Sequence, residues 1–353
     1  MSVYFYTLAA VSVLMILYGY QRFADDVKLF LFILVTAILL FVAGFRFRVG
    51  TDYTQYARNY VLSYSKFTWQ DFSPLAQPGA AVVAWFAKGI HHSYKTWFFL
   101  MSLCTVVPAM IGIYRNSQWK LMSVLMYLFL GCWHFPFNIV KQGVAAAILF
   151  LAYPLLRDRH FWKWCLCCLA AAMFHISALL MIPIYFLARP KITKWNILVI
   201  LAISIVCMFA YDFLYNLMAI LKQGSGMIHS NSRVLNTGVN ILRILVHCSP
   251  VALFAVFHEK YDKEDKDVAC LFNLAFLNAA LNVASMNSVY LNRFSNYTII
   301  YNVLFFPILL KPLKGKRLGW IKAVVLILFF AFWTYDLYKG STTSNYQWIF
   351  STT

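Results

Sequence analysis

Uncharged apolar runs recur along the whole chain, and they constrain its fold more than any other feature. Leu29–Phe45, for example, contains no charged side chain. About 20 apolar helical residues span a hydrocarbon core of roughly 30 Å, so such runs predict transmembrane helices. The runs are Val3–Tyr20, Leu29–Phe45, Thr96–Tyr114, Leu121–Val140, Gly143–Leu156, Trp195–Tyr211, Ile244–Phe257, Val268–Tyr290, Phe294–Leu310 and Ile321–Tyr335. We therefore expect an all-α polytopic membrane protein with about ten transmembrane helices.

The remaining sequence leaves little room for a soluble domain. The chain is 62% hydrophobic and 12% charged, whereas soluble domains carry about 25% charged residues. Its longest polar stretches are residues 46–78 and 212–240. We expect one integral membrane domain over residues 1–353. The N-terminus shows no basic segment or small-residue cleavage site, which predicts a retained first helix.

Basic residues predict the orientation of the chain, because short cytoplasmic loops are enriched in lysine and arginine. This bias, with anchors at anionic headgroups, accounts for the net charge of +18. Nucleic acid is therefore not an expected partner. Three clusters are predicted to be cytoplasmic: Arg157, Arg159 and Lys163; Arg189, Lys191 and Lys194; and Lys311, Lys314, Lys316 and Arg317.

Two short segments must be re-entrant for this orientation to hold. Trp164–Ala188 separates the first two basic clusters and would place them on opposite sides if it crossed the membrane once. Folded at His175 into two half-helices, it would dip in and return. We interpret Gly79–Ala87 similarly, which places residues 46–78 and 212–240 and both termini outside. Irregular backbone at membrane depth must be buried or line a wet cavity.

Four polar clusters are not explained by membrane anchoring. The first comprises Arg46, Arg48, Asp52, Tyr53 and Tyr56. Asp52 could cap a helix with the sequence YTQYARNYVL, Arg46 could anchor a helix end, and the tyrosines could form an interfacial belt.

The other three clusters lie later in the sequence. Asn138, Lys141 and Gln142 open a small-residue helix, where a cation and two amides could bind an anion. His175, with Ser177 nearby, is either a hydrogen-bonded core residue or a group facing the cavity. Arg243 and Arg293 are costly in lipid, so Arg293 must lie at an interface or in a polar site.

Four motifs contain or adjoin most of these residues: RFRVGTDYTQY, NIVKQGVAAAILFLA, RDRHFWKWCLCCLAAAMFHISALLMIPIYFL and LNRFSNYTIIYNVLFFPIL. In this order they resemble the EpsG-like branch of Wzy polymerases, which join lipid-linked oligosaccharide repeats into O-antigen, capsule or exopolysaccharide. The resemblance runs from about Arg46 to Leu310. It departs from the family at Lys141, where an arginine is usual, and at Gln77, where a glutamate is usual.

The resemblance implies a GT-C-like, all-α enzyme of the bacterial inner membrane, with its active site facing the periplasm or exterior. Its substrates would be oligosaccharides linked to undecaprenyl diphosphate, and a chain-length regulator is a candidate partner. It implies functional weight for Arg46, Asp52, Tyr53, Gln142, His175 and Arg293.

Residue chemistry suggests roles within this reaction. Breaking the anomeric bond leaves negative charge on the diphosphate, which arginines can stabilise without a metal or another cofactor. We expect Arg46 and Arg293 to do so, with Lys141 and Arg243 in reserve. His175 is favoured over Asp52 as the base, because histidine titrates near neutrality. Tyr53, Tyr56, Asn138 and Gln142 are candidates for binding the acceptor sugar.

Two other classes of function remain open. A lipid-linked oligosaccharide flippase or transporter would share the spans and a cationic cavity, but would be expected to show internal repeats. A membrane O-acyltransferase would place a histidine at membrane depth, open to a cytoplasmic thioester. Sidedness separates this class from a polymerase, which needs Arg46, Asp52 and Arg293 on the outer side.

Overall fold

The computed structural model describes residues 1–73, 76–223, 240–286, 289–315, 318–339 and 345–351. Most of these residues are helical, which confirms the predicted all-α class. The chain forms two compact units, one made of residues 1–182 and 314–353 and the other of residues 183–313. The expected single domain stays a prediction, and each unit is described by itself.

The first unit contains most of the predicted site residues. Its α-helices are α1 (Ser2–Tyr18), α2 (Asp25–Gly44), α3 (Tyr53–Leu62), α4 (Gly79–Ile90), α5 (Tyr94–Asn116), α6 (Lys120–Phe129), α7 (Val140–Leu151), α8 (Tyr153–Arg157), α9 (Phe161–Ala172) and α17 (Gly319–Lys339). Its 3₁₀ helices are η1 (Tyr64–Lys66), η2 (Trp69–Asp71), η4 (Phe135–Phe137), η5 (Ile176–Leu180) and η7 (Ile349–Ser351), and its strands are β1 (Arg46–Phe47) and β2 (Gln347–Trp348).

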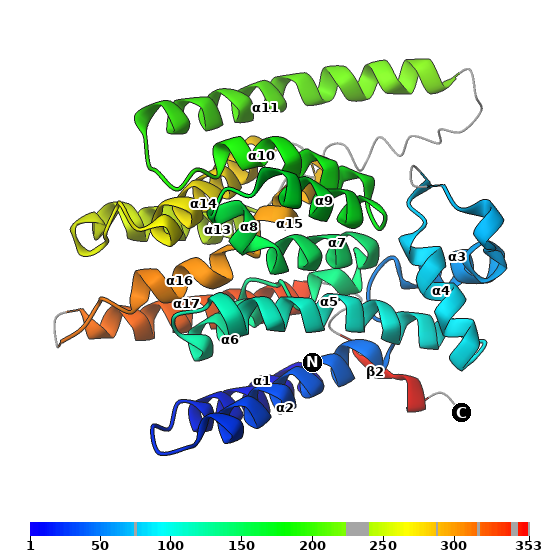
Figure 1. Ribbon diagram of the computed structural model, residues 1–353, viewed down its shortest axis with the longest axis horizontal. Helices are drawn as coiled ribbons and strands as arrows, with labels where there is room; N and C mark the ends of the chain where they lie inside the picture. The colour runs from blue at the N-terminus through cyan, green and yellow to red at the C-terminus, as the bar shows by residue number, and fades with distance from the viewer. Residues whose placement is uncertain (74–75, 224–239, 287–288, 316–317, 340–344, 352–353) are drawn as a thin grey trace. The chain divides into compact units, whose positions relative to one another are not determined.

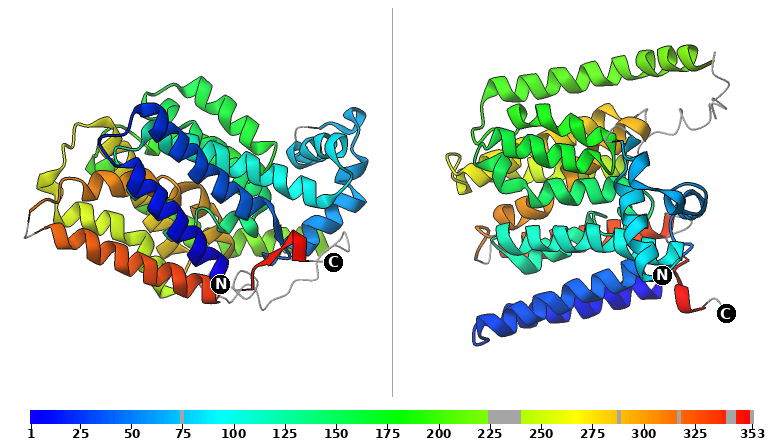
Figure 2. Two further views of the ribbon diagram at one scale, coloured as in Figure 1. Left: turned by 90° about the horizontal axis from the view of Figure 1, so that it is seen from below. Right: turned by 45° about the vertical axis from the view of Figure 1, so that its right-hand side comes forward.

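Helices α1 and α2 lie side by side, and α5 packs against both α2 and α7 (Figures 1 and 2). The C-terminal segment returns to the end of α2. Strand β2 pairs antiparallel with β1, with Arg46 opposite Trp348, and the Tyr346 hydroxyl donates to Val42 O at 2.6 Å. These contacts join the end of α2 and the strand that follows it to the C-terminal segment, which is far away in sequence.

The helix break predicted at His175 is confirmed. Helix α9 ends at Ala172, and η5 begins at Ile176. The chain then reverses direction: the Trp164 indole, at the start of α9, donates a hydrogen bond to Met181 O, beyond η5, at 3.0 Å. The segment is therefore a helical hairpin and not one straight helix. Its placement in the membrane remains a prediction.

The other predicted short segment is α4, which has 12 residues. At 1.5 Å per residue it is about 18 Å long, too short to cross a bilayer. One face is buried through Ala80, Val83, Ala84 and Ala87. Trp85 and Phe86 on the other side are 41% and 57% exposed.

In the described part of the chain, four helices have the length and hydropathy to span a membrane. These are α2, α5, α14 (Lys266–Ala284) and α17. The predicted count of about ten is not confirmed, because several runs divide into shorter helices. Leu121–Val140, for example, is interrupted after α6 by a turn at Gly131, whose φ is +79°, and by η4, which contains Pro136.

The second unit includes α11 (Lys194–Gln223), α13 (Ile241–Val256), η6 (His258–Lys260), α14, α15 (Val289–Ile299) and α16 (Asn302–Leu310), and the boundary at residue 182 falls within α10 (Met181–Leu187). The expected loop over residues 212–240 needs correction, because α11 continues to Gln223. Residues 224–239 lie outside the described residues.

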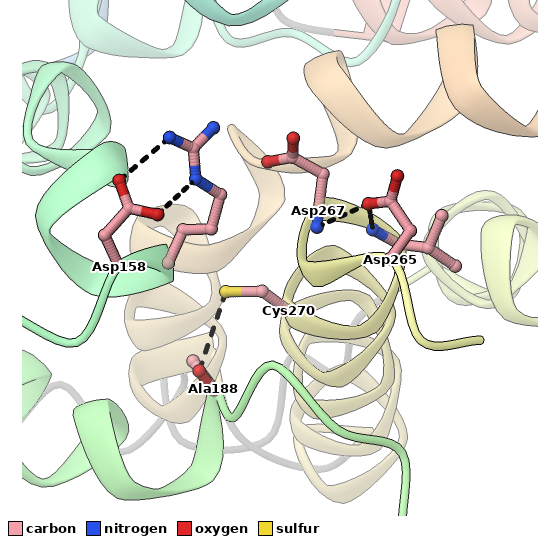
Figure 3. Close-up of polar contacts among 7 residues, drawn as sticks. Asp158, Ala188, Asp265, Asp267 and Cys270 are labelled. Carbon is pink, nitrogen blue, oxygen red and sulfur yellow. Dashed lines mark hydrogen bonds and ion pairs between the residues drawn. The ribbon is translucent and has the colours of Figure 1, made fainter. Parts of the chain in front are cut away.

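Helix α14 is the centre of the second unit, since α11, α13, α15 and α16 all pack against it. Asp265 caps its N-terminus, accepting from the backbone amides of Asp267 at 2.7 Å and Val268 at 3.1 Å (Figure 3). The Cys270 thiol on the same helix donates to Ala188 O at 3.5 Å. Such an N-cap contributes about 1 kcal/mol to helix stability.

Candidate functional site

Two of the predicted motifs meet at a tight turn in the first unit. The Asn138 carboxamide oxygen accepts from the Thr51 amide at 2.7 Å. Gly50 has a φ of +107°, and a Cβ there would collide with the Phe137 carbonyl and lie 3.0 Å from Asn138 Oδ1. Asn138 therefore holds the turn that precedes Asp52, which is a structural role beside its predicted role in sugar binding.

Asp52 occupies the N-cap position of α3, whose helix matches the predicted YTQYARNYVL sequence. Its carboxylate makes no capping hydrogen bond, and instead accepts from the Thr51 hydroxyl at 3.1 Å. The residue is half-buried. The carboxylate is therefore not committed to the helix terminus, which is compatible with a role as base or orienting group.

Arg46 is buried in the core of the first unit, with 2% of its surface exposed. Its Nη1 donates to Ala43 O and, at 2.9 Å, to Ser102 Oγ on α5. The guanidinium carbon lies 4.6 Å from the Phe137 ring centroid and 5.3 Å from that of Phe98. Burial lowers its pKa to about 10, so the side chain remains protonated at neutral pH.

The surroundings of Arg46 correct the expectation that it grips a diphosphate in an open pocket. The cavity beside it has a volume of about 10 Å³, close to the space of one water molecule. Its Nε has no hydrogen-bond partner in the described part of the chain. In this structure Arg46 joins α2, α5 and η4, and a diphosphate does not fit beside it.

The two predicted sugar-binding tyrosines belong to an aromatic core. Tyr53 is 3% exposed, and its ring stacks on Phe98 at 4.2 Å between centroids with an interplanar angle of 4°. Tyr56 is half-buried, with its ring 5.9 Å from Trp97. One face of Tyr53 is therefore covered by protein, so sugar stacking on that face would require the ring to move.

The helix α7 begins with the predicted polar residues. Lys141 is half-buried and Gln142 is 3% exposed. Val140 and Val144 pack in the same hydrophobic cluster as Phe47 and Tyr53. Lys141 therefore belongs to a helix that packs against the RFRVGTDYTQY motif.

His175 lies at the turn of the helical hairpin and is half-buried. Its Nδ1 lies 2.6 Å from Ser177 Oγ. The hairpin turn is held by Gln77 and Gly79, since Ile176 N donates to Gln77 Oε1 at 3.3 Å and Gly79 N donates to Met173 O at 2.7 Å. Gln77, where related sequences usually have a glutamate, therefore contacts the turn that carries His175.

Phe174, which precedes His175, packs against the cluster that contains Tyr53 and Val140. The structure therefore brings the segments that carry the first, second and third predicted polar clusters to one region of the first unit. Arg243 and Arg293 belong to the second unit, on α13 and α15. Arg243 is half-buried and Arg293 is exposed.

A buried polar network in the second unit was missed by the sequence analysis. His247 Nδ1 lies 2.7 Å from both Asn278 Oδ1 and Asn282 Nδ2, so its tautomer decides which contact is a hydrogen bond. The Asn278 amide donates to Ser295 O at 3.0 Å and Thr298 Oγ1 at 2.9 Å. The network joins α14 to α13 and α15, the two helices that carry the predicted arginines of this unit.

Replacing Asn278 with alanine should lower the free energy of unfolding by about 1–2 kcal/mol, because it removes the hydrogen bonds that Asn278 makes to two neighbouring helices. Asn116→Ala is the matched control, since among the residues that the structure describes Asn116 donates only to Gly112 O in its own helix. Thermal unfolding in detergent measures both. Equal shifts for the two variants would contradict a linking role for Asn278.

A second pair outside the predicted set joins η4 to α17. His134 Nε2 lies 3.3 Å from Asp336 Oδ2, and His134 is 3% exposed. His134 Nδ1 is buried without a hydrogen-bond partner among the described residues. The sequence signal was an aspartate near the end of an apolar run, which can signify a buried partner.

Comparison with known protein families matches residues 1–349 to the EpsG family. The chain therefore belongs to the EpsG family. This is a Wzy-like polymerase family, which confirms the resemblance seen in the sequence and points to a membrane protein of polysaccharide biosynthesis. No curated protein and no solved structure matches the chain.

Proposed function

We propose that the chain is a polysaccharide polymerase. It transfers a growing glycan from undecaprenyl diphosphate to the non-reducing end of another lipid-linked repeat unit. The observation that carries the proposal is the family match over nearly the whole chain. Support comes from the first unit, where the segments bearing Asp52, Lys141 and His175 pack around one core.

In this proposal a hydroxyl of the acceptor sugar attacks the anomeric carbon of the donor. The new glycosidic bond forms as the bond to the diphosphate breaks, and the hydroxyl proton passes to a base. His175 is the proposed base, and Asp52 positions the acceptor or a neighbouring cation. The departing lipid diphosphate carries the negative charge away and is stabilised by cationic side chains.

The proposed enzyme acts in the bacterial inner membrane, with its site facing the periplasm or exterior. The activated lipid supplies the energy for transfer, so neither nucleotide nor metal is required in the proposed reaction. Candidate partners besides the lipid-linked glycan are the bilayer and a chain-length regulator.

The experiment is reconstitution of the purified full chain with a lipid-linked repeat unit. We expect a ladder of glycans that differ by one repeat, formed in the presence of EDTA and without nucleotide. Gel separation of the released glycans measures the ladder, and a heat-denatured sample is the control. A repeat unit that remains single would contradict the polymerase, and a ladder abolished by EDTA would contradict metal independence.

A further inference from the structure

An open groove lies on the outside of the motif that contains Arg46, between β1 and α3. Its volume is about 450 Å³, within the range of roughly 300–1,000 Å³ typical of ligand pockets. Phe47 and Tyr94 line it together with Ala57, Val61 and Leu62 of α3. Val61 and Leu62 are 57% and 53% exposed, so much of the lining is exposed apolar surface.

Cations border this apolar surface. Arg48 and Arg58 both line the groove and are exposed. Neither makes an ion pair within the described part of the chain. Lys95 adds a third positive charge, with its Nζ 5.5 Å from the Phe47 ring centroid. The lining residues include no aspartate or glutamate, so the groove is complementary to an anion attached to an apolar chain.

The backbone at Arg48 is held in an unfavourable conformation. Its φ is +52°, in the left-handed region that costs a non-glycine residue of order 1–3 kcal/mol. The turn places the Arg48 guanidinium carbon 5.2 Å from the Phe47 ring centroid, beside the groove. Such strain persists where the surrounding structure fixes it, and here the strained residue supplies one of the two arginines that line the groove.

We propose that this groove is a docking site for a polyprenyl diphosphate. Arg48 and Arg58 bind the diphosphate, and the first prenyl groups lie along Phe47, Val61 and Leu62. The assignment to a substrate lipid rests on the proposed polymerase function. In this site the lipid diphosphate contacts two exposed arginines, whereas Arg46 is buried and not accessible to it.

Binding of a short water-soluble probe, farnesyl diphosphate, tests the proposal. The purified full chain is titrated in detergent by isothermal calorimetry. We expect the Arg48→Gln/Arg58→Gln double variant to bind at least tenfold more weakly, since two charge-assisted contacts to phosphate are lost. Arg48→Lys/Arg58→Lys should recover part of this loss by keeping the charge. Lys66→Gln removes an exposed cation of the same segment that does not line the groove, and should bind as the wild type does.

Two further probes distinguish a substrate lipid from other phosphates. Val61→Ser should weaken farnesyl diphosphate and leave inorganic diphosphate unchanged, because only the former has an apolar chain. Equal affinity of the wild type for both probes would overturn the lipid assignment. Binding to phosphatidylglycerol nanodiscs is measured for the double glutamine variant as well. If the variant loses as much nanodisc binding as farnesyl diphosphate binding, the arginines are general membrane anchors and the lipid assignment is also overturned.

Unchanged farnesyl diphosphate binding by the double glutamine variant would overturn the site itself. Thermal unfolding of each variant checks that the fold is retained, which we expect because both arginines are exposed. Binding is measured without glycan, so it is independent of the ladder experiment. A chain that binds through these arginines but forms no ladder would refute the polymerase and leave the docking site supported.

Discussion

Replacing His175 with alanine should reduce the rate of glycan extension by roughly 10²–10⁴, the contribution typical of a general base. The half-buried imidazole sits at the hairpin turn, and its Nδ1 is 2.6 Å from Ser177 Oγ. Cells or reconstituted membranes carrying the variant should accumulate single-repeat glycan. Glycan length on gels, with protein abundance measured in parallel, checks this outcome.

Ser177→Ala is the matched control for this variant. It removes the hydroxyl next to His175 but keeps the imidazole, so we expect a loss of less than about tenfold if the imidazole itself accepts the proton. Full-length glycan from His175→Ala would remove the residue from the mechanism. An equal loss from both variants would assign the effect to the shape of the turn and not to proton transfer.

Replacing Gly50 with alanine should cause the largest loss of stability among the variants considered. The backbone conformation alone costs of order 1–3 kcal/mol for a residue with a Cβ. The added Cβ would also collide with the Phe137 carbonyl. Relief of that collision would break the hydrogen bond between Thr51 and Asn138, so polymerase activity should fall with stability. Thermal unfolding in detergent and the ladder experiment measure the two effects.

Two glycines elsewhere provide controls that separate strain from collision. Gly315 has a φ of +82°, but a Cβ added there would meet no atom of the described residues within 4 Å, so we expect alanine to add strain alone. Gly89 is helical and equally open, and alanine should stabilise the helix by about 0.5–1 kcal/mol. If Gly50→Ala unfolds at the same temperature as Gly315→Ala, the contact with Phe137 is not important.

Local features of the sequence predicted individual elements well. The α3 helix occupies the expected YTQYARNYVL segment, and the predicted break at His175 is present. Both depend on neighbours in sequence, namely a turn before an aromatic stripe and a polar residue within an apolar run. Apolar runs alone did not predict helix lengths, because turns such as that at Gly131 interrupt them.

The candidate site was predicted less completely. The sequence indicated that Asp52, Asn138 and His175 were important, and their segments do pack around one core. It favoured Arg46 over Arg48 for binding the diphosphate, whereas the structure buries Arg46 and leaves Arg48 exposed at a groove. The network of His247 and Asn278 was also missed, because those residues are 31 positions apart and lie in apolar runs.

The sequence by itself determined the membrane class, the helical fold, the family and the position of the helix break. These follow from hydropathy, periodicity and short motifs, which are properties of neighbouring residues. Only the tertiary structure decided that Arg46 is buried while Arg48 and Arg58 face a groove. Burial depends on which distant segments pack together, and here α5, η4 and the C-terminal strand enclose one arginine and leave the next one open.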